Sequence, residues 1–71
     1  MRISARNQFS GKVTEIIDGS VNGIVVIDIG GGNKVSATIS MASIRELDLK
    51  VGGDAIAVIK STSVMVGVPH E

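Results

Sequence analysis

Hydrophobic and polar residues alternate along most of the chain, in short segments separated by turn-forming residues. The pattern is clearest in residues 34–40, where Val35, Ala37 and Ile39 fall on one face of an extended chain and polar residues fall on the other. A period of two in segments rich in Val and Ile predicts β-strands. The predicted strands cover residues 13–17, 23–29, 34–40, 55–60 and 64–68.

The period changes in one segment, directly after the third predicted strand. Met41, Ile44 and Leu47 recur at a spacing of three residues, and Ser40 before them is a suitable helix N-cap. We therefore predict a helix of about two turns that starts after Ser40, with Ser43 in its first turn.

Five strands joined mostly by hairpins, with one short helix, predict an all-β fold: a small five-stranded OB-like barrel. Residues 30–33, Gly-Gly-Gly-Asn, predict the hairpin turn between the second and third strands. Residues 24–27 are apolar on both faces, which is typical of a strand that is central in its sheet or covered by a partner subunit. We predict one domain over residues 1–68 and a short tail over residues 69–71.

Composition adds a prediction about assembly. The 71 residues are 44% hydrophobic with a mean hydropathy of +0.39, yet the chain has no Cys, and Phe9 is its only aromatic residue. A chain of this size, without disulfides or a thiolate metal site, rarely buries enough apolar surface by itself. The sequence therefore predicts an oligomer.

The charge balance and the short apolar runs limit the kinds of partner that the chain can bind. Seven Lys and Arg residues balance seven Asp and Glu residues, so the chain lacks the basic face and the stacking aromatic residues of a nucleic-acid-binding protein. The longest apolar run, residues 24–27, is too short to cross a membrane. Residues 1–8 contain no apolar stretch like that of a secretory signal, so we expect a cytoplasmic protein.

No pattern predicts an enzyme or a metal site. His70, the only histidine, lies one residue from the end of the sequence, and the carboxylates are scattered over turns and alternating positions. The glycine-rich residues 30–34 lack the Lys-Ser/Thr ending of a phosphate-binding loop and lead into a strand, not a helix. We expect neither a catalytic residue nor a metal ligand.

Three short segments are instead rich in hydrogen-bond donors and lack carboxylates: residues 4–8 (Ser-Ala-Arg-Asn-Gln), 40–43 (Ser-Met-Ala-Ser) and 60–63 (Lys-Ser-Thr-Ser). Each has an ordinary interpretation, because Arg6 suits a solvated charge, Ser40 a helix cap and Lys60 a strand end. The segments also suit an anion, since donors and positive charge are what an anion requires, but composition alone favours the ordinary interpretation of each.

The same segments carry a resemblance to a known family. Residues 4–8 and 11–13, 31–34, 38–44 and 57–65 resemble the Mop domain, the molbindin family within the TOBE superfamily. The resemblance covers residues 1–68 without a second domain, so the chain is identified as a free-standing single Mop domain.

This resemblance implies a cytoplasmic protein that binds molybdate, and also tungstate, in storage or homeostasis, without a covalent cofactor. It implies an OB-like barrel that assembles as a homo-hexamer, a trimer of dimers, with the oxyanion between subunits. Carried over to this sequence, the ligands from one subunit are Ser4, Ala5, Arg6, Lys60 and Ser61, and a neighbouring subunit supplies Ser43.

Other functions stay open at this point. The segments suit a general site for dianions such as sulfate, because sulfate carries the same charge as molybdate. A purely structural oligomerisation module is the second alternative. Phosphate is less suitable, because near neutral pH it retains a proton that a site made only of donors does not accept.

Overall fold

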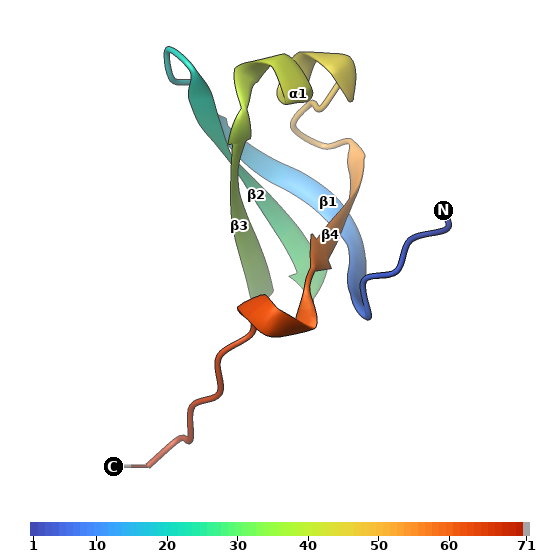
Figure 1. Ribbon diagram of the computed structural model, residues 1–71. Coiled ribbons are helices and arrows are strands. Elements are labelled where there is room, and N and C mark those ends of the chain that lie inside the picture. Colours follow the sequence, from blue (N-terminus) through green and yellow to red (C-terminus); the bar gives the residue numbers. More distant parts are fainter. Residues whose placement is uncertain (71) are drawn as a thin grey trace.

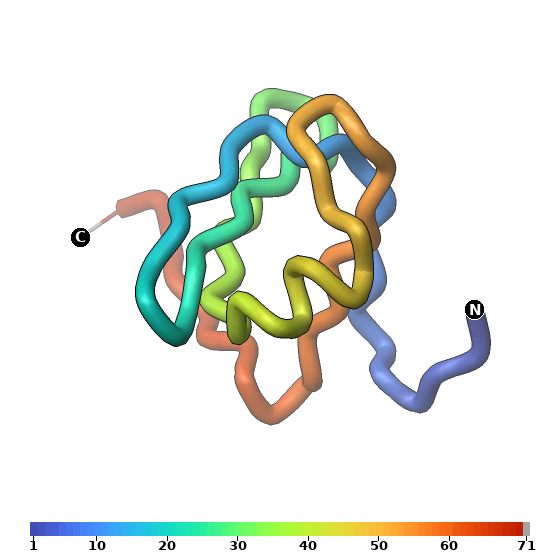
Figure 2. Tube along the Cα trace, turned by 90° about the horizontal axis from the view of Figure 1, so that it is seen from above, coloured from blue at the N-terminus to red at the C-terminus, as the bar shows by residue number. Residues whose placement is uncertain are grey.

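The computed structural model describes residues 1–70, and its main feature is one antiparallel sheet of four strands (Figure 1). In the sheet the strands lie in the order β3-β2-β1-β4, and the sheet curls into a half-barrel (Figure 2). Helix α1 lies at one end of the half-barrel and the 3-10 turn η1 at the other (Figure 1). The elements are β1 (Asn7–Ile17), β2 (Asn22–Gly30), β3 (Asn33–Ser40), α1 (Met41–Glu46), β4 (Asp54–Ile59) and η1 (Ser61–Ser63).

Four of the five predicted strands are confirmed, and β1 is longer than expected. Its first half pairs with β4, from Asn7 opposite Ile59 to Lys12 opposite Asp54. Its second half pairs with β2, up to Ile17 opposite Ile24. The residues at the start of β1 are mostly polar, so the hydrophobic pattern did not predict this extension. Their pairing with β4 makes them part of the strand.

The fifth strand, and with it the five-stranded barrel, is wrong for the chain as the structure describes it. Residues 64–68 run away from the half-barrel (Figure 1), and the side chains of Met65 and Val66 are 92% and 93% exposed. Val64 does have an extended backbone, with φ −89° and ψ 126°. A strand also needs a hydrogen-bonding partner, however, and residues 1–70 provide none for this segment.

The core lies on the concave face of the sheet, beneath α1. It consists of five buried side chains: Val13, Val25, Ile27, Ile44 and Ala57. β2 is a central strand, as predicted from its apolar residues, but only one of its faces is fully covered, since Ile24 on the other face is 37% exposed.

The start of α1 is as predicted. The Ser40 side chain accepts a hydrogen bond from the Ser43 backbone N–H at 3.0 Å, and Ile44 is buried. Leu47, the third residue of the three-residue spacing, is 66% exposed. The helix ends at Glu46, so Leu47 is its C-cap and lies beyond the regular helical positions.

Glycines at two places in the sheet are required by its backbone. Gly31 and Gly32 form the predicted turn between β2 and β3, with φ angles of 63° and 79° that disfavour other residues. Gly11 lies where β1 crosses closest to β2: a Cβ atom there would be 2.1 Å from the Asp28 carbonyl oxygen. A side chain at Gly11 would therefore clash with the backbone of β2.

The half-barrel is open between its two edge strands, β3 and β4. An apolar groove of about 970 Å³ lies there, lined among others by Val35 and Ile39 of β3 and by Ala57 and Ile59 of β4. The division into a domain over residues 1–68 and a tail over residues 69–71 stays a prediction, and Glu71 lies outside the described residues. Among residues 1–70, no helix is both long and apolar enough to cross a membrane.

Candidate anion-binding site

Two of the three donor-rich segments meet in one pocket of about 290 Å³. We call it the Arg6–Lys60 pocket. One wall is the segment before β1 and the other is the segment after β4, so residues more than fifty positions apart in the sequence face the same space. Its lining consists of Ser4, Ala5, Arg6, Lys60, Ser61 and Thr62.

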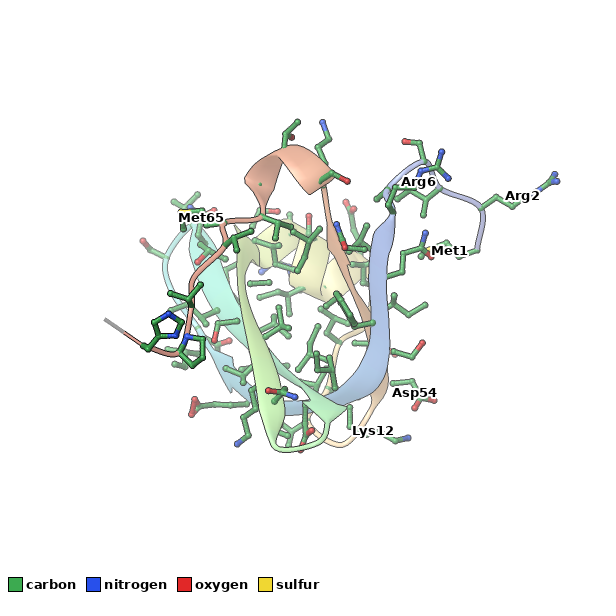
Figure 3. The ribbon with its side chains drawn as sticks, turned by 90° about the horizontal axis from the view of Figure 1, so that it is seen from below. Met1, Arg2, Arg6, Lys12, Asp54 and Met65 are labelled. Carbon is green, nitrogen blue, oxygen red and sulfur yellow. The ribbon has the colours of Figure 1, made fainter. Side chains whose placement is uncertain are left out.

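Strand pairing brings the two walls together. Asn7 and Ile59 are opposite each other at the end of the β1–β4 ladder, so the residues next to them, Arg6 and Lys60, leave the sheet side by side. The Asn7 side-chain amide adds a hydrogen bond to the Ile59 carbonyl oxygen at 3.2 Å. Figure 3 shows Arg6 at this end of β1, and Lys12 and Asp54 at the other end of the β1–β4 pairing.

The pocket carries uncompensated positive charge. Arg6 and Lys60 are both exposed, and neither forms an ion pair within residues 1–70. The ion pairs of this part of the chain lie elsewhere, between Lys12 and Asp54 and between Lys50 and Asp48. No carboxylate is present in the lining. Two cations and three hydroxyls without an acidic neighbour have the chemistry that an anion requires.

Of the six residues predicted as ligands, the structure brings five into this pocket: Ser4, Ala5, Arg6, Lys60 and Ser61. Their roles as ligands stay predictions. The sixth, Ser43, lies on α1 at the opposite end of the half-barrel (Figure 1). Within one chain Ser43 therefore does not belong to the pocket.

Ser43 takes part in the cap of α1. Its backbone N–H donates to Ser40 Oγ at 3.0 Å, and the hydroxyl oxygens of Ser40 and Ser43 lie 2.8 Å apart. A hydroxyl both donates and accepts, so this contact leaves Ser43 further hydrogen-bonding capacity.

Thr62 lines the pocket but was not among the predicted ligands. It belongs to η1, the 3-10 turn that follows Lys60 and directs the chain around the pocket. The run of hydroxyl residues at 61–63 was visible in the sequence, but only the fold shows which of them reach the lining.

Acidic side chains form no competing site in the described part of the chain. Among residues 1–70, His, Asp and Glu side chains do not gather in groups of three or more that could hold a metal ion. One carboxyl is perturbed: the Lys12 ammonium donates a hydrogen bond to Asp54 and attracts its charge, which holds the pKa of Asp54 below its ordinary value. That pair is exposed and lies at the other end of β4 from the pocket.

Comparison with known proteins shows the family of the chain. The TOBE domain family matches residues 3–66. A probable molybdenum-pterin-binding protein of Haemophilus influenzae is 65% identical over 96% of this chain and 99% of its own length. Molybdenum-pterin-binding protein 3 of Clostridium pasteurianum is 52% identical over 93% of this chain and 97% of its own length.

Solved structures show the same fold. MopII from Clostridium pasteurianum, in an apo form, superposes with a TM-score of 0.89 at 48% identity, over 94% of this chain and 100% of that one. A molybdate-binding protein from Sporomusa ovata gives a TM-score of 0.88 at 35% identity, over 96% of this chain and 100% of that one. ModG, a cytoplasmic molybdate-binding protein with molybdate bound, gives a TM-score of 0.91 at 40% identity, over 97% of this chain and 49% of that one. The family match covers most of the chain and the identities extend over nearly its full length, so the chain belongs to the TOBE domain family and, as its sequence indicated, to the Mop domains within it.

Proposed function

We propose that this protein binds molybdate, and also tungstate, as intact oxyanions in the Arg6–Lys60 pocket. The observation that carries the proposal is the meeting of Arg6 and Lys60, both without ion pairs in residues 1–70, in a pocket whose lining has three hydroxyls and no carboxylate. Molybdate at neutral pH is a fully deprotonated tetrahedral dianion, so it accepts hydrogen bonds and donates none. The pocket offers what such an anion needs.

The relatives support this choice of anion. Similar chains over the full length are called molybdenum-pterin-binding or molybdate-binding proteins, and one solved relative holds molybdate. That relative, ModG, is described as cytoplasmic, and we place this protein in the same compartment. Its role there is storage or homeostasis of the anion, by binding and not by catalysis.

A pterin is a less suitable ligand, although several relatives carry the word in their names. A pterin is a flat ring system, and proteins commonly hold such rings against aromatic side chains. Phe9, the only aromatic residue of this chain, is absent from the lining of the pocket. The polar lining favours the inorganic anion.

The site is completed between subunits in this proposal, with Ser43 of a neighbouring copy donating to the anion held by Arg6 and Lys60. The assembly is a homo-hexamer, a trimer of dimers. Two observations support self-association: residues 64–68 leave Val64, Met65, Val66 and Val68 between 48% and 93% exposed, and the groove between β3 and β4 is apolar and open.

These two features are complementary. An extended apolar segment can pair with an edge strand and bury its side chains in an apolar groove. We assign the groove of one copy to residues 64–68 of another, which would also add the strand that the pattern predicted and that a single chain leaves unpaired.

Calorimetric titration tests the proposed function. The protein is titrated with molybdate, tungstate, sulfate and phosphate at the same pH and ionic strength. Saturable binding of molybdate and tungstate, with phosphate much weaker, supports the proposal. Tightest binding of sulfate would instead identify a general dianion site, and the absence of heat with all four anions would leave only the structural module.

A further inference from the structure

The Arg6–Lys60 pocket lies at an end of the sheet that is only two strands wide. Residues 7–11 of β1 pair with β4 alone, because the pairing of β1 with β2 begins only at Lys12. β4 has no neighbouring strand on its other side. A two-stranded ribbon has little stability of its own, and its last pair of residues opens more easily than the core does. That last pair is Asn7 and Ile59.

The charges next to this last pair act against it in the free protein. Arg6 precedes Asn7 and Lys60 follows Ile59, and neither cation has an ion pair within residues 1–70. Like charges on neighbouring chain segments repel each other, and salt screens that repulsion only in part. The two strand ends that carry the cations therefore tend to separate when no anion lies between them.

The side chain of Asn7 opposes this separation. Its amide donates a hydrogen bond to the Ile59 carbonyl oxygen at 3.2 Å, and both residues are partly buried. Within residues 1–70, side-chain hydrogen bonds connect β1 to β4 at two places. The other one, from Lys12 to Asp54, lies at the far end of the β1–β4 pairing. At the pocket end, this connection therefore depends on Asn7.

We propose that Asn7 is a positioning residue of the anion site, which holds the end of β1 against β4 and so keeps Arg6 and Lys60 at one separation. Asn7 is absent from the lining of the pocket, so it acts through the two cations and not by touching the anion. Without its hydrogen bond, binding has to order the two strand ends, and this ordering lowers the affinity. The inference rests on the proposed function of the same pocket.

Asn7→Leu is the test variant, because leucine has a similar size and shape but no donor. Calorimetry with the full-length protein should show molybdate binding about three- to tenfold weaker than in the wild type, the effect of one hydrogen bond.

Thr14→Val is the matched control. It removes another hydrogen bond from a side chain to a carbonyl oxygen of the neighbouring strand, from Thr14 Oγ1 to Val26 at 3.4 Å, and Thr14 does not line the pocket. Its affinity for molybdate should stay within about twofold of the wild-type value, less than the effect of one hydrogen bond.

A covalent clamp between the two strands separates positioning from a merely structural effect. Gln8 and Val58 are the next opposite pair of the β1–β4 ladder, both are exposed, and neither lines the pocket. Opposite residues of antiparallel strands lie within the distance that a disulfide spans. The chain has no Cys, so Gln8→Cys with Val58→Cys introduces its only two thiols, and mass spectrometry reports whether they are joined.

In the Asn7→Leu background, the disulfide should restore the affinity for molybdate, and its reduction should lower the affinity again by about three- to tenfold. The oxidised and reduced proteins have the same sequence, so they differ only in the clamp. With Asn7 present, oxidation should change the affinity by less than about twofold, because the strand ends are already held.

Three results would overturn the inference. The first is an Asn7→Leu protein that binds molybdate within about twofold of the wild type, and the second is an Asn7→Leu protein with the same affinity in its oxidised and reduced forms. The third is a disulfide that does not form when Asn7 is present, because this would contradict the β1–β4 register. Wild-type protein that does not bind molybdate at all is a separate failure, which would overturn the proposed function itself.

Discussion

The side-chain amide of Asn7 donates a hydrogen bond to the carbonyl oxygen of Ile59 over 3.2 Å, and the same two residues face each other in the β1–β4 ladder. Arg6 precedes one of them and Lys60 follows the other. The separation of the two cations at the backbone is therefore fixed by strand register and not by a loop. A site held in this way is positioned before any ligand arrives, which lowers the cost of binding.

Removing either cation of the pocket should weaken molybdate binding. A hydrogen bond to a charged group is worth about 1.5–3 kcal/mol, which corresponds to about a ten- to a hundredfold loss of affinity. We expect this for Arg6→Ala and for Lys60→Ala in calorimetric titrations. Lys34→Ala is the control, because Lys34 is an exposed cation next to the β2–β3 turn and does not line the pocket. Equal affinities in the three variants would show that the site is assigned to the wrong residues.

A charge in the exposed C-terminal segment should prevent assembly. Val66 is 93% exposed in the single chain, so Val66→Asp should not disturb the monomer fold. In the proposed assembly the new carboxylate would be buried in an apolar groove, which is costly. Sedimentation should show an oligomer for the wild type and smaller species for the variant. His70→Asp adds the same charge outside residues 64–68 and should still assemble; a Val66→Asp variant that sediments like the wild type would contradict the assigned groove.

Gly11→Ala should destabilise the fold. The added Cβ would lie 2.1 Å from the Asp28 carbonyl oxygen, a backbone atom that can move only by distorting the β1–β2 pairing. Overpacking of this kind costs about 1–3 kcal/mol. Urea unfolding should report this loss, whereas Thr38→Ala, an exposed change on β3, should stay within about 0.5 kcal/mol of the wild type. Wild-type stability of the Gly11→Ala protein would mean that β1 and β2 are further apart than described.

The ion pair between Lys12 and Asp54 predicts a pH dependence. The hydrogen bond and charge of Lys12 lower the pKa of Asp54 in the folded protein. The pair therefore contributes stability that is present above the unfolded-state pKa of Asp54 and is lost as the pH falls through its folded-state pKa. Lys12→Met should raise the midpoint of the Asp54 titration, measured by NMR, and remove this part of the acid dependence.

Lys50→Met is the control for this titration, because Lys50 pairs with Asp48 at 3.4 Å and not with Asp54. Its Asp54 midpoint should equal that of the wild type. An unchanged midpoint in Lys12→Met would show that the two side chains do not interact in solution.

Local patterns predicted most of the fold because local chemistry determines it. The alternation at Val35, Ala37 and Ile39 places one face of β3 against the core, and Ser40 caps α1 as its position indicated. The prediction of a strand over residues 64–68 was wrong because a strand also needs a hydrogen-bonding partner, and residues 1–70 provide none for this segment. The spacing of Met41, Ile44 and Leu47 predicted a helix after Ser40, and the helix ends one residue before Leu47.

The residue types of the site could be predicted from the sequence, but their arrangement in space could not. Donor-rich segments around Arg6 and Lys60 are visible in the sequence, and the resemblance to Mop domains assigned both segments to one binding site. That they meet follows from the pairing of Asn7 with Ile59, which no local pattern contains. Thr62 and the hydrogen bond from Gln8 to Ala5 depend on the path of the backbone around the pocket, so only the structure shows them.

Anomalous X-ray diffraction of crystals grown with molybdate tests most directly whether molybdate binds in the Arg6–Lys60 pocket. The molybdenum atom gives a peak in the anomalous difference map that requires no assumption about its ligands. We predict a peak at the pocket lined by Arg6 and Lys60, with Ser43 of a neighbouring copy on its open side. A molybdenum peak away from these two cations, with this pocket empty in the same crystal, would contradict the claim.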